Sequence, residues 1–336
     1  MPVPCTGRKK SKQTNPVGQL TYHITENDMN NAIAMPRPAR TNAPTLSSSA
    51  MLVELTISMW VGRKTDKGAS AQVLADNNAS KGMASVSKRL LDCPQLDALK
   101  TMVGAIRTAH RQATLPWSES GLRLVTNEQY IDYHRNITGM INEFHKLVEQ
   151  LLDAYQWEVA SAQAKLGDLF DINEYPTTSE LRGKFRVSLA YMALPEAGDF
   201  RLDIPAAALN DLREQSHKHY QLQITKAMAD LWQRLLEPLQ NMSTRLAYSH
   251  GDTPTGFRDT LVSNVEDIAA LLKTCNIAGD PDMEQIRLDL VQTLRGVTAD
   301  GLRHDPYLRS QTKARVDNIL TRAHQAAAPA LASLDM

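Results

Sequence analysis

Residues 127–169 read NEQYIDYHRNITGMINEFHKLVEQLLDAYQWEVASAQAKLGDL, and this stretch decides the fold class. Apolar side chains recur in it at spacings of three and four, the period of one face of an α-helix. The spacing predicts a single helix over about 127–170, roughly 60 Å long at 1.5 Å per residue. Such a length is more typical of coiled-coil arms than of compact bundles. The apolar series comprises Ile137, Met140, Ile141, Phe144, Val148, Leu151, Tyr155, Val159, Ala162, Leu166 and Leu169.

A second apolar series with the same spacing predicts another long helix over about 205–248. Pro205 suits its first position, where the missing N–H has no partner to lose. Pro238 lies inside it and should bend it, because proline removes one hydrogen bond and clashes with the preceding turn.

Between the two helices, residues 186–204 predict a β-hairpin. Apolar and polar residues alternate over 186–194 and again over 199–204, and Pro195–Gly198 supplies the turn. Two long helices joined through a hairpin predict a long antiparallel helical arm with a small β-hairpin tip.

The rest of the chain completes a mainly α (α+β) fold. Upstream we expect a strand over 52–60, a polar loop over 62–68, helices over 69–91 and 95–113, and a short strand over 121–125. Downstream, helices over 257–275, 281–297 and 306–320 predict a C-terminal helical bundle. The predicted organisation is a disordered basic, Pro-rich tail (1–48), a single mostly helical domain (49–300), and a C-terminal helix with an Ala-rich tail (301–336).

The bulk composition favours a globular intracellular chain. Hydrophobic residues make up 42% and aromatic residues only 5%, so aliphatic side chains must supply most of the core. Lys+Arg and Asp+Glu are both 37, which leaves no net field to attract nucleic acid or a membrane. No apolar run approaches eighteen residues and the N-terminus lacks an apolar signal region, so we expect a cytoplasmic protein. Cys93 and Cys275 are expected to be reduced, small core residues.

The sequence contains none of the common catalytic or cofactor motifs. Neither GxxxxGK[ST], GxGxxG, GxSxG nor HExxH occurs. His217 and His219 are two apart in a predicted helix, so they point to different faces and cannot share a metal there. No catalytic, cofactor-binding or metal-binding residue is therefore assigned, and the chain is expected to bind rather than to catalyse.

Two groups of residues are candidates for a binding surface. Trp60 precedes Arg63, Lys64 and Lys67, which could stack a base and hold phosphate; the alternative is a tryptophan packed beneath Arg and Lys stems. The second group lies on the predicted hairpin and consists of Tyr191, Phe200 and Arg201. These residues could form a recognition tip, or they could pin the hairpin to its neighbours. Both interpretations are equally open.

Several short motifs, in their order along residues 50–300, resemble those of an uncharacterised family of phage and bacterial proteins. The resemblance implies a cytosolic protein, some of whose relatives lie near genes for MoxR-type ring ATPases of the AAA+ class. The resemblance transfers no catalytic residues to this chain. The motifs are Ile57–Lys64 (ISMWVGRK), Pro176 with Glu180–Arg182 and Phe185, Gly198–Arg201 (GDFR), Phe257–Asp259 (FRD) with Leu261 and Asn264–Val265, Asn276–Ile277 and Asp280–Pro281.

These observations lead to two main hypotheses. The first is a non-enzymatic phage or mobile-element protein that acts in the cytoplasm of the host cell as a protein-binding scaffold, with a ring ATPase among its expected partners. The alternative is a single-stranded nucleic-acid-binding protein of phage DNA metabolism, motivated by Trp60 and its basic neighbours. Either hypothesis allows the protein to form a homo-oligomer. A third hypothesis is an enzyme whose catalytic site is assembled only by the fold.

Overall fold

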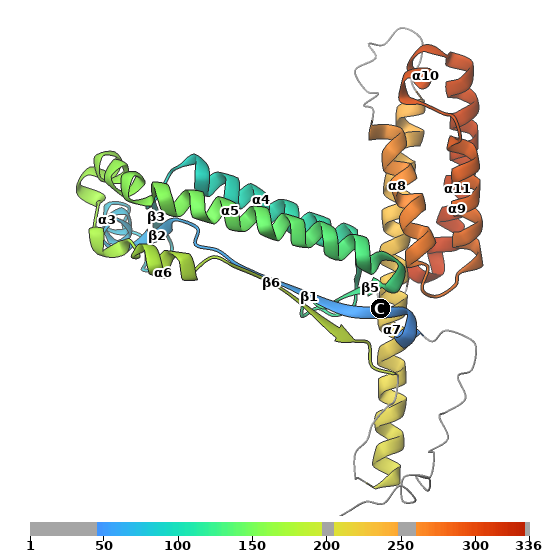
Figure 1. The fold of residues 1–336 in the computed structure, drawn as a ribbon, viewed down its shortest axis with the longest axis horizontal. Helices are drawn as coiled ribbons and strands as arrows, with labels where there is room; N and C mark the ends of the chain where they lie inside the picture. The colour runs from blue at the N-terminus through green and yellow to red at the C-terminus, as the bar shows by residue number, and fades with distance from the viewer. Residues whose placement is uncertain (1–45, 197–204, 248–259, 333–336) are drawn as a thin grey trace, which may run out of the picture. The chain divides into compact units, whose positions relative to one another are not determined.

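The stretch 127–169 forms one continuous helix almost to its end. In the computed structural model this helix is α5 (Asn127–Leu166), forty residues long. The structure describes residues 46–196, 205–247 and 260–332. Helices predominate over strands in these ranges (Figure 1), which confirms the predicted mainly α, α+β class. Of the predicted tail, only its last three residues are described, in a helical turn, α2 (Leu46–Ser49).

An antiparallel sheet of four strands has the order β4-β5-β1-β6. The predicted strands 52–60, 121–125 and 186–194 are all present with small shifts of their ends. β1 is central and pairs with β6 along most of its length, from Met51↔Ala193 to Ser58↔Arg186. The strands are β1 (Ala50–Ser58), β4 (Leu115–Pro116), β5 (Arg123–Thr126) and β6 (Arg186–Ala193).

The side chains of β1 connect the three hydrophobic clusters of the described chain. Leu52 belongs to the cluster of the C-terminal helices, while Val53, on the opposite face, packs with Tyr133 and Ile137 of α5. Farther along, Leu55 contacts the cluster between α4 and α5. Because successive side chains of a strand point to opposite faces, β1 contacts the C-terminal helices on one face and α4 and α5 on the other.

The two long helices do not pair as one antiparallel arm, so this part of the prediction was wrong. α5 packs mainly against α4 (Pro94–Gln112). α7 (Ala206–Leu246) instead packs mainly against α8 (Thr260–Cys275) and α11 (Pro306–Ala332). Helical periodicity shows that a helix has an apolar face but does not show which partner covers it. α7 continues through Pro238, and none of its residues before Gln223 is fully buried.

The hairpin prediction is supported in its first strand only. β6 takes β1 as its partner and so belongs to the main sheet rather than to a separate tip. The predicted second strand, 199–204, lies outside the described residues. Alternation predicts a strand, but the partner here is more than a hundred residues away in sequence.

The C-terminal helices form the predicted bundle with the second half of α7 (Figure 1). Asp280 caps α9, since its carboxylate accepts from the backbone N–H groups of Asp282 and Met283. The Ala-rich end is not a loose tail, because α11 runs to Ala332 with Ala323 and Ala327 fully buried. The helices are α8 (Thr260–Cys275), α9 (Pro281–Leu294), α10 (Ala299–His304) and α11 (Pro306–Ala332).

Cys93 and Cys275 are buried core residues, as predicted. Burial raises the pKa of the Cys275 thiol to about 11. No helix within the described ranges has the length and apolar character needed to cross a bilayer.

Candidate binding surface on the flap

The sequence predicts a polar loop and then a long helix after β1, and the structure differs from this prediction. This segment forms a two-stranded ribbon, β2 (Arg63–Asp66) and β3 (Val86–Arg89), with α3 (Lys67–Asp76) between the strands. The helix begins there because the Asp66 carboxylate caps the N–H of Ala69. The helix is only ten residues long and ends just before Asn78, whose backbone is left-handed with a φ of 49°. We call residues 63–89 the flap.

The flap has almost no hydrophobic core of its own. Neither β2 nor α3 contains a buried residue, and Lys88 is the one buried residue between Arg63 and Arg89. A segment that buries so little apolar surface gains little from the hydrophobic effect. Polar contacts must therefore hold the flap against the rest of the protein.

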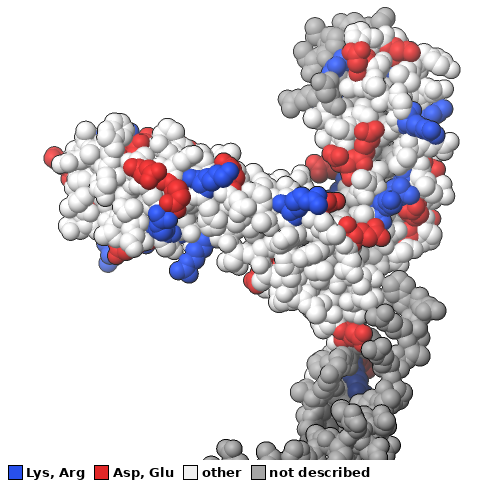
Figure 2. Space-filling model, in the orientation of Figure 1, with Lys and Arg blue, Asp and Glu red and all other residues white. Residues whose placement is uncertain are grey.

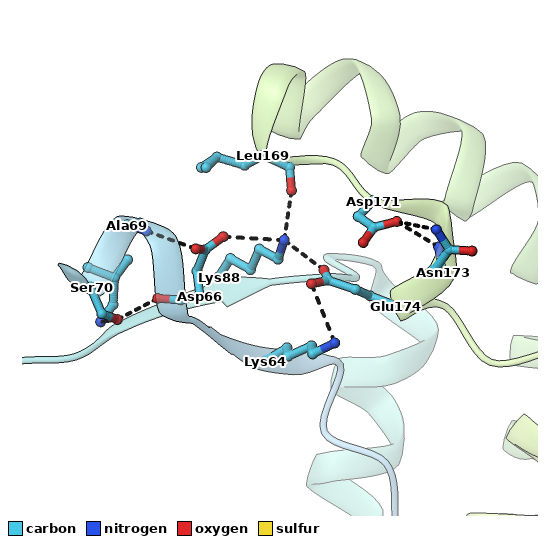
Figure 3. A network of polar contacts seen from close by, with 10 residues as sticks. Lys64, Asp66, Ala69, Ser70, Lys88, Leu169, Asp171, Asn173 and Glu174 are labelled. Atoms are coloured by element: carbon cyan, nitrogen blue, oxygen red, sulfur yellow. Dashed lines mark hydrogen bonds and ion pairs between the residues drawn. The ribbon is translucent and has the colours of Figure 1, made fainter. Parts of the chain in front are cut away.

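Lys88 supplies these contacts (Figure 3). Its ammonium lies 2.7 Å from a Glu174 carboxylate oxygen and 3.4 Å from that of Asp66. It also donates a hydrogen bond of 2.8 Å to the carbonyl oxygen of Leu169. Glu174 and Leu169 belong to the connection between α5 and α6 (Thr178–Gly183), so Lys88 joins the flap to that connection. Lys64 adds a half-exposed ion pair of 3.4 Å to Glu174.

The ionisation equilibria agree with this geometry. The Glu174 carboxylate raises the pKa of Lys88 above its usual value, against the opposing effect of burial. The pKa of Asp66 is lowered, first by the backbone N–H of Ala69 and then by Lys88. Asp66 thus has two roles, as helix cap and as ion partner, whereas the principal role of Lys88 is to bind the two carboxylates.

Replacing Lys88 with methionine should release the flap without unfolding the rest of the chain. The change keeps the length of the side chain but leaves the Glu174 carboxylate with a much weaker partner. We expect amide hydrogen exchange in β2 and β3 to accelerate about tenfold or more, while α4 and α5 keep their protection. Exchange measured by mass spectrometry reports both.

Lys64→Met is the matched control, because Lys64 pairs with the same carboxylate but its side chain is 52% exposed. Exposed pairs contribute little, so this variant should exchange nearly like the wild type. Equal exchange in Lys88→Met and wild type would show that Lys88 does not hold the flap.

Trp60 and Gly62 lie at the base of the flap. The Trp60 ring is half-buried and packs edge-on against Tyr155, with 6.4 Å between centroids. Gly62 has a φ of +64°, and a Cβ atom there would lie 2.7 Å from the side chain of Leu96. Its carbonyl oxygen accepts from the N–H groups of Leu90 and Leu91, which closes the flap at its base.

The basic residues of the first predicted group, Arg63, Lys64 and Lys67, lie on the flap and are exposed. Lys64 is paired with Glu174, as described above. Within the described part of the chain, Arg63 and Lys67 form no ion pair, and neither does Lys81 in the turn between α3 and β3. The flap carries six Lys or Arg residues and two Asp residues, a net charge of +4 in a chain whose overall charge is zero.

Tyr191 belongs to a different place. It lies on β6 opposite Val53, and its hydroxyl is 3.0 Å from a ring nitrogen of His134. Its ring contacts Tyr130 and Tyr133 edge-on at 5.2 and 6.5 Å. Burial raises its pKa to about 12. These contacts pin β6 to α5, and a role for Tyr191 in recognition stays a prediction; Phe200 and Arg201 lie outside the described residues.

Half of the exposed large hydrophobic side chains belong to the flap and to the segments that border it in the fold, and sequence reasoning missed most of them. Trp157 on α5 is the clearest example, since 72% of it is exposed. The available signal was its position off the apolar series, between Tyr155 and Val159. Twelve large hydrophobic residues are exposed in the described chain, and six belong to the flap, its base, or the end of α5 and the connection after it: Val61, Val73, Met83, Trp157, Leu169 and Ile172.

Charges on the face drawn in Figure 2 are mixed in sign, with Lys and Arg interspersed with Asp and Glu. No cluster of three or more His, Cys, Asp or Glu side chains in the described ranges is placed to hold a metal ion. Comparison with protein-family models, curated proteins and solved structures finds no match to this chain.

Proposed function

We propose that this chain is a protein-binding module whose flap end docks a partner that presents acidic and apolar groups. The observation that carries the proposal is the coincidence of two features in one region. Half of the exposed large hydrophobic residues of the described chain belong to the flap, its base, or the end of α5 and the connection after it, and the flap carries three cations that form no ion pair. Exposed apolar groups near such charges are typical of protein interaction sites.

Trp157 is the residue best suited to anchor such a partner. Tryptophan is enriched among the few residues that contribute most of the binding energy at interfaces. A side chain 72% exposed adds little to the stability of its own fold, so its large apolar area is free for a partner.

Nucleic-acid binding is less well supported by the same geometry. Binding of single strands combines cations with aromatic rings on which bases stack. The ring proposed for stacking, Trp60, is packed against Tyr155, and the sequence from Val61 to Arg89 contains no aromatic residue. The flap itself therefore carries cations but no aromatic ring on which a base could stack. Trp157, the exposed ring of the same region, lies on α5 rather than on the flap.

The resemblance described above makes a MoxR-type ring ATPase the first partner to test. Membership of that phage and bacterial family, and action in the host cytoplasm, form part of the proposal. A second copy of the chain is the other partner to examine, and analytical ultracentrifugation detects it directly.

Reversing the three unpaired flap cations should weaken partner binding. The triple variant Arg63→Glu/Lys67→Glu/Lys81→Glu is expected to lower affinity for the purified ATPase about tenfold or more. Most of this loss should appear as a lower association rate constant, because the reversed charges no longer attract an acidic partner. Surface plasmon resonance measures both rate constants.

The matched control reverses three exposed cations that form no ion pair in the described residues and lie away from the flap, on α4, α7 and α11. It has the same net charge, so equal weakening by both triple variants would assign the effect to overall charge. Equal binding by the flap variant and wild type contradicts the proposed surface. Salt-dependent binding of a labelled oligonucleotide, lost only in the flap variant, would favour nucleic acid instead. The control substitutions are Arg107→Glu, Arg213→Glu and Arg315→Glu.

A further inference from the structure

The strand β6 (Arg186–Ala193) lies at one edge of the main sheet and has a partner on one side only. The strand order β4-β5-β1-β6 places β1 beside it and no strand beyond it. β1 is also the one described element in extensive backbone contact with β6, so no described helix packs along the open edge. The outward N–H and C=O groups of β6 are therefore open to water or to another strand.

β6 lacks the features by which natural proteins protect an edge strand from pairing. Protected edges are usually very short, contain proline or carry charged side chains. β4, at the other edge of the same sheet, has two residues, and one of them is Pro116. β6 has eight residues without proline or glycine, and its first residue, Arg186, is the only charged one. A strand of this kind is a ready template for β-sheet pairing between chains.

The side chains of β6 alternate between the two faces of the sheet. Val187, Leu189 and Tyr191 are half-buried and pack toward α4 and α5, whereas Ser188 and Ala190 are exposed on the opposite face. A second copy related by a two-fold axis perpendicular to the sheet would keep equivalent faces on the same side. With Ala190 on that axis, Leu189 lies opposite Tyr191 of the second copy, which makes a favourable apolar pair.

The charges that flank β6 are complementary under the same symmetry. Lys184 precedes the strand and Glu196 follows it, each six positions from Ala190, and both side chains are exposed. Glu196 accepts a hydrogen bond of 3.5 Å from Ser47, which leaves its charge available. An antiparallel pair centred on Ala190 brings each Lys184 toward Glu196 of the other copy, twice over. This charge pattern favours a second copy over an unrelated strand.

We propose that β6 pairs antiparallel with β6 of a second copy of this chain, about a two-fold axis at Ala190, so that the two main sheets become one continuous sheet. The pairing would satisfy the outward backbone groups of both strands. The proposal goes beyond the proposed function and does not involve the flap, so self-association and partner binding can fail separately.

Sedimentation velocity of the full-length protein over a dilution series tests the association itself. We expect a dimer whose fraction follows mass action. A wild type that stays monomeric at the highest concentrations would leave the edge to a strand of another protein and would overturn the proposal.

Ala190→Lys tests where the two copies meet. It would place two lysines side by side at the axis, where like charges directly opposite each other are destabilising. A monomer should tolerate the change, because Ala190 is exposed and pairs with Glu54 of β1. We expect the dissociation constant of the dimer to rise about fivefold or more. Amide hydrogen exchange in β6 should accelerate as its outer edge is exposed.

Thr56→Lys is the matched control, since it adds the same charge on the same exposed face of the sheet, but on β1, one strand in from the edge. It should dimerise like the wild type, and circular dichroism would confirm that both variants are folded. If Ala190→Lys dimerises as tightly as Thr56→Lys, or exchanges in β6 no faster, the copies do not meet at β6.

A charge exchange tests the register. Lys184→Glu and Glu196→Lys should each weaken the dimer about threefold, because each turns two attractive contacts into two repulsive ones. The double variant restores the opposite charges in exchanged positions and should dimerise nearly like the wild type. A double variant weaker than both single variants would contradict an axis at Ala190.

Discussion

Replacing Trp232 with alanine is expected to lower the free energy of unfolding by about 3–5 kcal/mol. Trp232 lies on α7, is 1% exposed, and is the largest fully buried side chain in the described residues. Its cluster includes Leu52, Leu115 and Leu124 of the sheet together with residues of the C-terminal helices. The alanine variant would leave a cavity where these two parts of the chain share one core.

Urea denaturation followed by circular dichroism measures this loss. Trp157→Ala is the control, since the same substitution at a side chain 72% exposed should change stability by less than about 0.5 kcal/mol. If the sheet and the helices form one cooperative unit, Trp232→Ala should unfold in a single transition at lower urea. Two separated transitions, or a loss similar to that of Trp157→Ala, would contradict a shared core.

The predictions that succeeded depend on local sequence. The spacing of apolar residues in 127–169 gave α5 to within a few residues, and Asp280–Pro281 correctly marked the start of α9. Partners were not predictable in the same way, because every amphipathic helix offers the same kind of apolar face. That is why α5 and α7 were wrongly paired with each other.

The flap was mispredicted because its apolar residues do not face a core. Val73 and Met83 suggested part of a buried helical stripe, yet both are exposed. What begins α3 and holds β3 against the connection after α5 is polar: the cap at Asp66 and the contacts of Lys88 with residues more than eighty positions away. Apolar periodicity carries no information on such contacts.

The candidate binding surface likewise contains residues that local sequence predicts and residues that it does not. Arg63, Lys64 and Lys67 are adjacent in sequence, so a basic surface could be predicted without knowing the fold. Lys88 could not, because a charged residue in a sequence is assumed to be exposed. Only the fold buries it, between the carboxylates of Asp66 and Glu174.

His110 makes the stability of the protein depend on pH. It lies on α4 with 6% of its surface exposed, and its Nδ1 is 2.7 Å from the hydroxyl of the buried Tyr133. Burial, followed by the neighbouring charges of Arg123 and Arg111, lowers the pKa of His110 to about 4. The imidazole is therefore neutral in the folded protein at pH values where an unfolded chain would protonate it.

The sign of the effect follows from this difference. Below the unfolded pKa of about 6.5, the unfolded state binds a proton that the folded state does not, so the free energy of unfolding falls as the pH falls. The loss continues until the pH reaches the folded pKa of about 4. At about 1.4 kcal/mol per pH unit, the expected contribution between pH 7 and pH 5 is a loss of about 2 kcal/mol.

His110→Gln removes this titration while keeping a neutral side chain that can bond to Tyr133. Urea denaturation at pH 7 and pH 5 should show a smaller loss of stability in this variant than in the wild type, by about 2 kcal/mol. His324→Gln, at an exposed position of α11, should lose as much as the wild type because its imidazole is solvated. Comparing the variants at both pH values cancels the contribution of carboxyl groups, which titrate in all three proteins. An equal loss in His110→Gln and wild type would show that His110 gains its proton in the folded state as readily as in the unfolded one.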